Sequence, residues 1–146
     1  MIIKNKESIH YLIRKFINHL MISGKKAKAE NMFEKSLLFI KEKEKKNPIY
    51  VFFCALEHSK PCVEVRSVRR GGATYQIPVP LKEKRGISLA MKWILQAARK
   101  KKGSFERNLS NVLLEASKNQ GDSVKKKESI HLIALKNRSL THFRWF

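Results

Sequence analysis

Residues 66–79 read RSVRRGGATYQIPV, and this stretch predicts a β-hairpin. Apolar and polar residues alternate after Gly71-Gly72, as they do in a half-exposed strand, and glycine adopts the positive φ angles that a tight hairpin turn requires. Three arginines lead into the turn: Arg66, Arg69 and Arg70. Guanidinium groups crowded on a protruding turn repel one another unless a polyanion lies opposite. The hairpin therefore predicts a nucleic acid partner.

The charge of the whole chain supports this interpretation. Its 146 residues include 32 lysines and arginines against 12 aspartates and glutamates, a formal charge of +20. The excess is spread along the chain, since residues 1–59 carry +6, residues 60–107 carry +10 and residues 108–146 carry +4. Such an imbalance destabilises a compact protein through self-repulsion, and a polyanionic partner relieves it.

Apolar residues recur at helical spacing in six segments outside the hairpin. The predicted helices span residues 7–21, 26–45, 48–57, 88–101, 104–118 and 123 to beyond 140. Asn47-Pro48 predicts the start of the third helix, because asparagine caps helices and proline fits the first helical position. Ser104 is predicted to cap the fifth helix and Gly121 to end it. Trp93 falls on the apolar stripe of the fourth helix, so we expect it to be buried.

The sequence thus predicts a mainly α fold, in which six helices form a single domain of residues 1–146 with one protruding β-hairpin at about residues 62–80. The chain shows no internal repeat and no low-complexity linker. Its apolar stretches are far shorter than the roughly 20 residues of a membrane span, which argues against an integral membrane protein. Two cysteines are too few for a disulfide framework and fit a reducing compartment.

Three further basic runs lie at or near predicted helix ends: Lys25-Lys26 with Lys28, residues 99–102, and residues 125–127. A charge run usually marks a solvated helix end, and residues 99–102 would also complement the dipole of the helix that they close. Helix termini contact phosphates through both backbone and side-chain groups. Taken together, the three runs favour contact with RNA.

Cys54, His58 and Cys62 have a spacing that suggests a metal site. Cys54 and His58 would share a helix face, but Pro61 displaces Cys62 from helical spacing and a fourth ligand is not evident. Buried thiols beside a histidine are the favoured interpretation. The chain also lacks a phosphate-binding loop, a dinucleotide-binding glycine motif and a paired-carboxylate pattern. We therefore expect no enzyme, no cofactor and no metal.

Several stretches resemble the family of the universal small-subunit ribosomal protein seven. The hairpin does so from Val63-Glu64-Val65 through residues 71–79, GGATYQIPV. The likeness continues through LAMKWI at 89–94 and AAR at 97–99, and the ending matches at KKKE (125–128), His131, Asn137-Arg138 and HFRW (142–145). Upstream, residues 16–18, 24–26 and 29–30 are similar to the opening helices of the family. The similarity covers nearly the whole chain.

This resemblance implies a structural constituent of the ribosome that binds the 3′ major domain of small-subunit rRNA and organises the head. It places the hairpin near the exit-site tRNA and the mRNA path, with neighbouring head and platform proteins as partners, no membrane and no homo-oligomer. With Lys100 added from its basic run, the RNA-binding candidates are Lys25, Lys26, Arg66, Arg69, Arg70, Tyr75, Gln76, Arg99, Lys100, Lys125, Lys126, Arg138 and Arg144.

The chain departs from the family pattern in three places. Family members often read Arg-Arg-Val before Gly-Gly, whereas Val68-Arg69-Arg70 shifts the arginines by one position and so to the other face of the strand. The basic arm ahead of the first helix is nearly absent, and the tail beyond Trp145 is one residue long. The contacts that these extensions make are then missing or supplied by neighbours.

The ending and the composition indicate a mitochondrial-type member of the family. The chain has 23 lysines against 9 arginines, with 13 isoleucines, a usage typical of an AT-rich genome. The first helix starts too early to leave room for a cleaved presequence. We therefore expect a mitochondrial small subunit, with a plastid or the bacterial cytoplasm as the alternative.

The charge alone also permits a second hypothesis, an architectural DNA-binding protein of nucleoid type. A preference for duplex DNA over structured rRNA would favour that alternative.

Overall fold

A computed structural model describes residues 6–45 and 47–143, and in these residues the chain forms six α-helices, one 3-10 helix and one β-hairpin. The elements follow in the order α1 (Lys6–Leu20), α2 (Lys26–Glu44), α3 (Pro48–Ser59), β1 (Val63–Arg70), β2 (Ala73–Pro80), α4 (Glu83–Lys100), α5 (Phe105–Ser117), α6 (Asp122–Lys136) and η1 (Arg138–Phe143). The prediction of a mainly α fold with one hairpin is confirmed. Within the described residues, no helix is long and apolar enough to cross a membrane.

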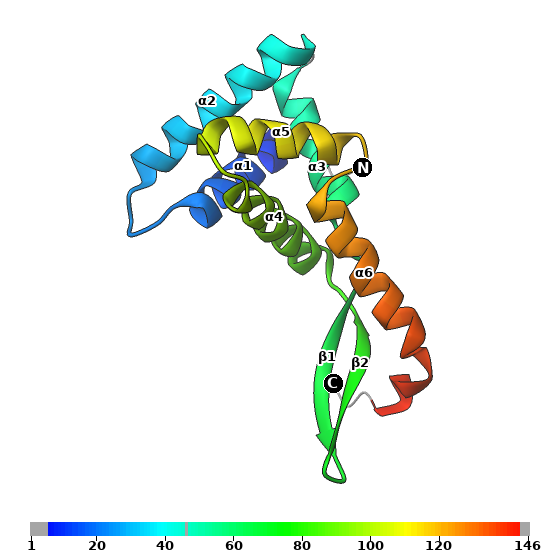
Figure 1. Cartoon of the computed structure of the whole chain (residues 1–146). Coiled ribbons are helices and arrows are strands. Elements are labelled where there is room, and N and C mark those ends of the chain that lie inside the picture. Colours follow the sequence, from blue (N-terminus) through cyan, green and yellow to red (C-terminus); the bar gives the residue numbers. More distant parts are fainter. Residues whose placement is uncertain (1–5, 46, 144–146) are drawn as a thin grey trace.

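The hairpin has the turn that the glycine pair predicts. Its strands are antiparallel, with Arg70 paired to Ala73 and Val63 paired to Pro80, so that Gly71-Gly72 alone forms the loop. Both glycines have positive φ angles, 54° and 82°, the combination of a type I′ turn. The hairpin projects from the helical body, and α6 and η1 run beside it (Figure 1).

Helix α3 begins as predicted, at an asparagine cap. The Asn47 side chain accepts a hydrogen bond from the backbone N–H of Ile49 at 3.0 Å, and Pro48 occupies the first helical position. The cap thus satisfies one of the backbone donors that every helix start leaves without an intrahelical partner.

Two predicted helix ends are wrong in detail. Asn119, not Gly121, adopts the left-handed conformation after α5, with φ 57°, and backbone bonds from Asn119 and Gln120 return to Ala116 and Glu115 as in a Schellman motif. Gly121, with φ 91°, instead precedes the first residue of α6. Ser104 precedes α5 as predicted, but its hydroxyl donates to the Glu106 carboxylate at 2.6 Å rather than capping the backbone.

Two helices have bounds that the apolar pattern did not predict. Helix α4 begins at Glu83, five residues before the predicted start at residue 88. The sequence pattern did not predict this first turn because residues 83–86 show no apolar periodicity. Gly86 lets this first turn approach the preceding segment closely, since an added Cβ would lie 3.0 Å from the carbonyl oxygen of Pro61. Helix α6 ends at Lys136 instead of passing residue 140, and the chain continues as the tighter η1.

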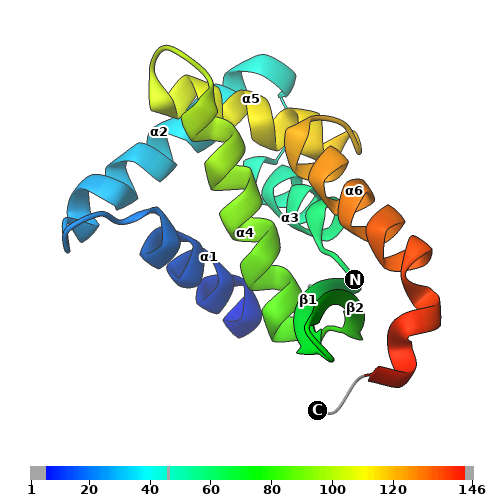
Figure 2. The same cartoon turned by 60° about the horizontal axis from the view of Figure 1, so that its bottom comes forward.

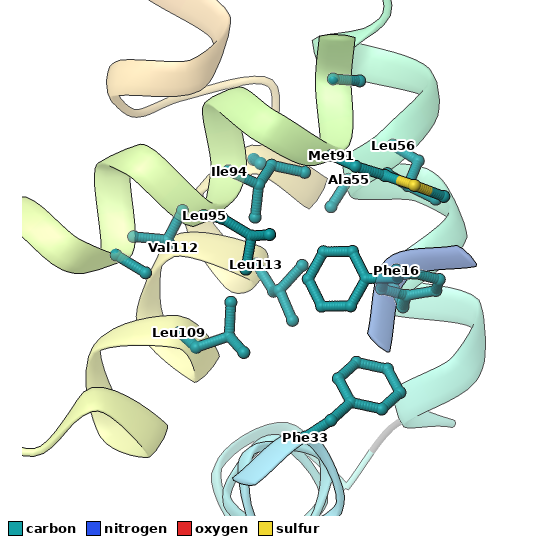
Figure 3. Packing of buried hydrophobic residues seen from close by; sticks show 14 of the residues in the cluster. Phe16, Phe33, Ala55, Leu56, Met91, Ile94, Leu95, Leu109, Val112 and Leu113 are labelled. Carbon is teal, nitrogen blue, oxygen red and sulfur yellow. The ribbon is translucent and has the colours of Figure 1, made fainter. Parts of the chain in front are cut away.

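The core lies where α1 to α5 meet, and aromatic rings form its centre (Figure 3). Phe16, Phe33 and Phe52 have ring centroids 5.1–5.4 Å apart at tilted or edge-on angles, the geometry that aromatic pairs prefer. Leu109 and Leu113 of α5 are fully buried beside them. Trp93 is 6% exposed, so its predicted burial is confirmed.

The base of the hairpin is fixed to the body, whereas its tip is exposed. Ile77 and Val79 are buried near the base, while residues 71–74 are exposed. The His131 Nε2 atom accepts a hydrogen bond from the backbone N–H of Cys62 at 3.2 Å, which ties α6 to the segment leading into β1. Seen from below, α4 runs between α1 and α6, and the hairpin starts beside its first turn (Figure 2).

Candidate nucleic-acid interface

The strand register divides the basic hairpin between its two faces. Side chains of paired residues lie on the same face, and successive residues alternate. Arg66 and Arg70 therefore share one face with Tyr75, because Arg66 pairs with Ile77 and Val68 pairs with Tyr75. Arg69 lies on the opposite face with Gln76. The five predicted RNA contacts of the hairpin thus address two sides of it.

On the Tyr75 face, the hairpin is clamped by η1. The Tyr75 and Phe143 rings stack with centroids 5.4 Å apart and an interplanar angle of 26°. The Arg70 guanidinium lies 5.4 Å from the centroid of the same Phe143 ring, a cation–π distance. The Phe143 ring therefore covers one face of the Tyr75 ring. In this arrangement a base would have only the remaining edge or face of Tyr75 to contact.

Glu64 organises two arginines at the base of this face. Its carboxylate lies 2.7 Å from Arg66 and 3.4 Å from Arg85, which belongs to the first turns of α4. The Glu64 side chain is only 14% exposed, whereas both arginine side chains are more than half exposed. The carboxylate therefore orients both guanidiniums, while the two arginine side chains remain more than half exposed.

A second cationic cluster lies between the last turns of α4 and the first turns of α6. A cavity of about 260 Å³ there brings Arg99 and Lys100 of α4 together with Lys126 of α6. The Lys126 Nζ atom lies 2.8 Å from Gln96 Oε1 and 5.8 Å from the centre of the Trp93 ring. The fold thus unites two basic runs that stand far apart in the sequence.

A third cationic cluster lies at the corner between α1 and α2. Lys25 and Lys28 line a cavity of about 280 Å³ there, whose other walls are mainly apolar. Lys26 forms an exposed pair with Glu30 at 3.8 Å. The Arg99 guanidinium donates to the carbonyl of Leu20 at 3.4 Å, which links this corner to the end of α4.

The remaining predicted residues are separate from these clusters. Lys125 follows Gly121 by one helical turn and lines a different cavity with Glu115 and Glu128. Arg138 is exposed at the start of η1. Arg144 lies outside the described residues, as does Trp145.

Other lysines make contacts within the protein. Lys101 pairs with Glu115 at 2.7 Å, and Lys118 pairs with Glu44 at 2.5 Å. Lys127, the third lysine of its run, donates to the backbone carbonyl of His58. Of the run at 125–127, the structure thus uses Lys127 to hold α6 against α3, and only its two neighbours lie open to solvent.

The Cys54, His58 and Cys62 spacing does not produce a ligand cluster. Within residues 6–45 and 47–143, no group of three or more histidine, cysteine or acidic side chains is arranged to hold a metal ion. The His58 Nδ1 atom lies 3.0 Å from the carbonyl oxygen of Ala116, so this ring joins α3 to α5. Cys62 is exposed and Cys54 is only partly buried, so the interpretation of two buried thiols is wrong.

Comparison with known proteins identifies the family. A model of the family described as ribosomal protein S7p/S5e matches residues 2–138. The chain belongs to this family. It is 47% identical to the small ribosomal subunit protein uS7 of Petrotoga mobilis over 135 residues, which are 92% of this chain and 87% of that protein. Proteins of the same name from Thermosipho africanus and Aliivibrio salmonicida are each 44% identical over 92% of this chain and cover 87% and 86% of their own lengths.

Membership of the S7p/S5e family confirms the resemblance that the hairpin and the chain ending indicated. Members of this family are structural components of the ribosome and not enzymes, so the prediction of a ribosomal protein without catalytic activity is confirmed as well. The relatives named here are bacterial, and the expected mitochondrial origin is not shown by them.

Sequence reasoning missed two residues that shape this interface. The sequence marks Phe143 only as part of the matching ending, whereas in the structure its ring contacts both Tyr75 and Arg70. Gln96 is not among the predicted residues, although it precedes Arg99 and Lys100 by three and four positions. That spacing places all three on one helix face, which was the available signal.

Proposed function

We propose that this S7-family chain is a structural constituent of the small ribosomal subunit that binds the 3′ major domain of its rRNA and helps to organise the head. The observation that carries the proposal is the combination of a +20 charge with cationic clusters on three exposed parts of the described structure. Among the residues whose burial the structure describes, most lysines and arginines are exposed, and several acidic side chains orient or neutralise others.

Phosphate contacts give the affinity in this proposal, and the hairpin reaches furthest from the body (Figure 1). Arg66, Arg69 and Arg70 present guanidinium forks, which bind phosphate oxygens in pairs. Because Arg69 and Gln76 lie on the opposite face from Arg70 and Tyr75, a strand of RNA can be contacted on each side. This geometry supports a place for the hairpin near the exit-site tRNA and the mRNA path.

The other contacts follow the helix ends. We assign Lys25 and Lys26 to the corner of α1 and α2, Arg99, Lys100 and Lys126 to the cavity between α4 and α6, and Lys125, Arg138 and Arg144 to separate phosphates. Neighbouring proteins of the head and platform complete the surroundings of a single copy of the chain. For the compartment, the excess of lysine over arginine supports the mitochondrial small subunit, and the bacterial relatives fit the alternative of a bacterial cytoplasm.

The decisive experiment is binding to an rRNA transcript of the 3′ major domain at several salt concentrations. The logarithm of the affinity should fall linearly with the logarithm of the salt concentration, with a slope of roughly 0.7–0.9 per phosphate engaged. The triple variant Arg66→Ala, Arg69→Ala, Arg70→Ala should keep its helical circular dichroism and bind more weakly with a smaller slope. In cell extracts, the native protein should sediment with small ribosomal subunits.

Competition with duplex DNA separates this proposal from an architectural DNA-binding protein. If duplex DNA displaces the rRNA transcript at equal nucleotide concentration, the ribosomal assignment fails. Affinity that does not change with salt would also contradict it, because phosphate contacts release counterions when they form.

A further inference from the structure

The cavity between α4 and α6 has an aromatic floor and a charged rim. Trp93 and Ala97 form its floor, and both are more than nine-tenths buried. The rim carries Gln96, Arg99, Lys100, Asp122 and Lys126. An exposed cationic rim over an indole surface is the combination that proteins use to hold a nucleotide, because the base stacks while the phosphate meets the cations.

The rim has both signs of charge, which favours a nucleotide over a simple anion. Arg99 and Lys100 end α4 and stand on one side, where they can bind phosphate oxygens. Asp122 stands at the first turn of α6, where its carboxylate would repel a phosphate but accept a hydrogen bond from a base N–H group. A nucleotide has an anionic phosphate and a base with N–H donors. It can therefore place its phosphate on the cationic side of the rim and its base N–H groups beside Asp122.

Lys126 occupies the mouth of the cavity through exchangeable contacts. Its ammonium lies 5.8 Å from the Trp93 ring centre and 2.8 Å from the neutral Gln96 side chain. Neither contact is an ion pair, so the ammonium can leave the indole for a phosphate at little cost. An arriving base would then replace the ammonium on the ring.

The size of the cavity limits what it can hold. Drug-sized ligands occupy cavities of about 300–1,000 Å³, and this one measures about 260 Å³. The cavity is large enough for one nucleobase and too small for a base-paired nucleic-acid helix. The cavity at the corner of α1 and α2 is of similar size, but it has no aromatic wall.

We propose that this cavity is a binding site for one unpaired nucleotide of small-subunit rRNA, with the base against Trp93 and the phosphate on Arg99, Lys100 and Lys126. This inference rests on the proposed rRNA binding and adds to it a point of contact with a base. The hairpin arginines hold only the backbone, whereas this site distinguishes an unpaired nucleotide from one within a duplex.

The test uses the fluorescence of Trp93 in the full-length protein. The chain has two tryptophans, so the Trp145→Phe variant makes Trp93 the only one. The probe is a transcript of the 3′ major domain of small-subunit rRNA from Petrotoga mobilis, whose protein is 47% identical. Gel retardation measures binding independently of fluorescence. We expect Trp93 emission to be quenched in proportion to the fraction of RNA bound.

Two pairs of variants in this background identify the site. Ala97→Leu fills the cavity without a charge change and should remove the quenching and weaken binding by about 5- to 150-fold, the contribution of one stacked base. Its control is Ala29→Leu, an equally buried alanine in the wall of the other cavity, which should keep the quenching. Lys126→Ala should reduce the quenching, whereas Lys136→Ala, the same charge change at an exposed lysine in the last turn of the same helix, should preserve it.

The outcomes separate the two proposals. RNA that is retarded while Trp93 emission stays constant would overturn the nucleotide site and leave rRNA binding intact. Equal quenching in Lys126→Ala and Lys136→Ala would overturn it too, even if Ala97→Leu does not fold. A transcript that is not retarded at all would overturn the proposed function itself.

Discussion

Replacing Phe143 by alanine should release the hairpin from η1 while leaving the helical body folded. The substitution removes a Tyr75–Phe143 stack with a centroid distance of 5.4 Å and an Arg70 cation–π contact at the same distance. A two-stranded hairpin is marginally stable by itself, so the tip depends on such contacts. The base keeps its attachment, because the hydrogen bond from Cys62 to His131 does not involve η1.

The magnitude follows from the two lost contacts. An aromatic pair contributes about 0.5–1.5 kcal/mol and an exposed cation–π contact about 0.5–1 kcal/mol. The free energy of local opening should therefore fall by about 1–2.5 kcal/mol, which is roughly a 5- to 70-fold change in the opening equilibrium. Amide hydrogen exchange measures that equilibrium residue by residue. Cross-strand amides of residues 66–77 should exchange faster by this factor in Phe143→Ala.

Phe39→Ala is the matched control. Phe39 is also a partly buried ring with an arginine over it, at 5.6 Å from Arg107, but it lies on α2 away from the hairpin. Its replacement should leave the hairpin amides unchanged. If both variants accelerate the hairpin equally, or if Phe143→Ala changes these amides less than twofold, the clamp does not hold the hairpin.

Three further predictions concern stability. Burial, and then the charge of Lys127, lower the pKa of His131 from its ordinary 6.5. The contribution of His131 to folding stability is therefore complete above pH 6.5 and is lost as the pH falls through the lowered pKa. Thermal melts should show a decrease in Tm below pH 6.5, and an equal decrease in a His131→Gln variant would contradict this assignment. Asn47→Ala removes a cap and should cost about 1 kcal/mol, or roughly 2–4 °C in Tm, whereas Asn47→Asp should nearly restore it. Gly121→Ala should lower the free energy of unfolding by about 1–3 kcal/mol, because φ is 91° and the new Cβ would lie 3.0 Å from the Glu115 carboxylate; a denaturant midpoint equal to that of the wild type would refute this strain.

Short sequence motifs predicted local structure correctly where their residues strongly favour one conformation. Gly71-Gly72 fixed the hairpin turn and Asn47-Pro48 fixed a helix start, because few other conformations suit those pairs. The asparagine and the glycine near residue 120 were harder to assign. Both Asn119 and Gly121 tolerate positive φ, and only the backbone bonds to Glu115 and Ala116 decide which of them ends the helix.

The sequence showed which residues of the interface are basic, but not how the fold arranges them in space. Counting charges identified the basic runs, yet it could not show that Lys126 meets Trp93 while Lys127 turns inward to α3. These neighbours differ because they fall about 100° apart around α6, and what each direction faces depends on tertiary packing. The Tyr75–Phe143 stack likewise joins residues far apart in the sequence, a contact that no local pattern reports.

The clamp between the hairpin and η1 has a consequence for how this protein is made. Translation proceeds from the N-terminus, so both strands leave the ribosomal tunnel long before Phe143 is added. Until then the nascent hairpin has its turn and its base but lacks the stack on Tyr75. The arginine-bearing tip therefore acquires its final direction only after Phe143 has been made, when the helices that precede it in the chain have already been synthesised.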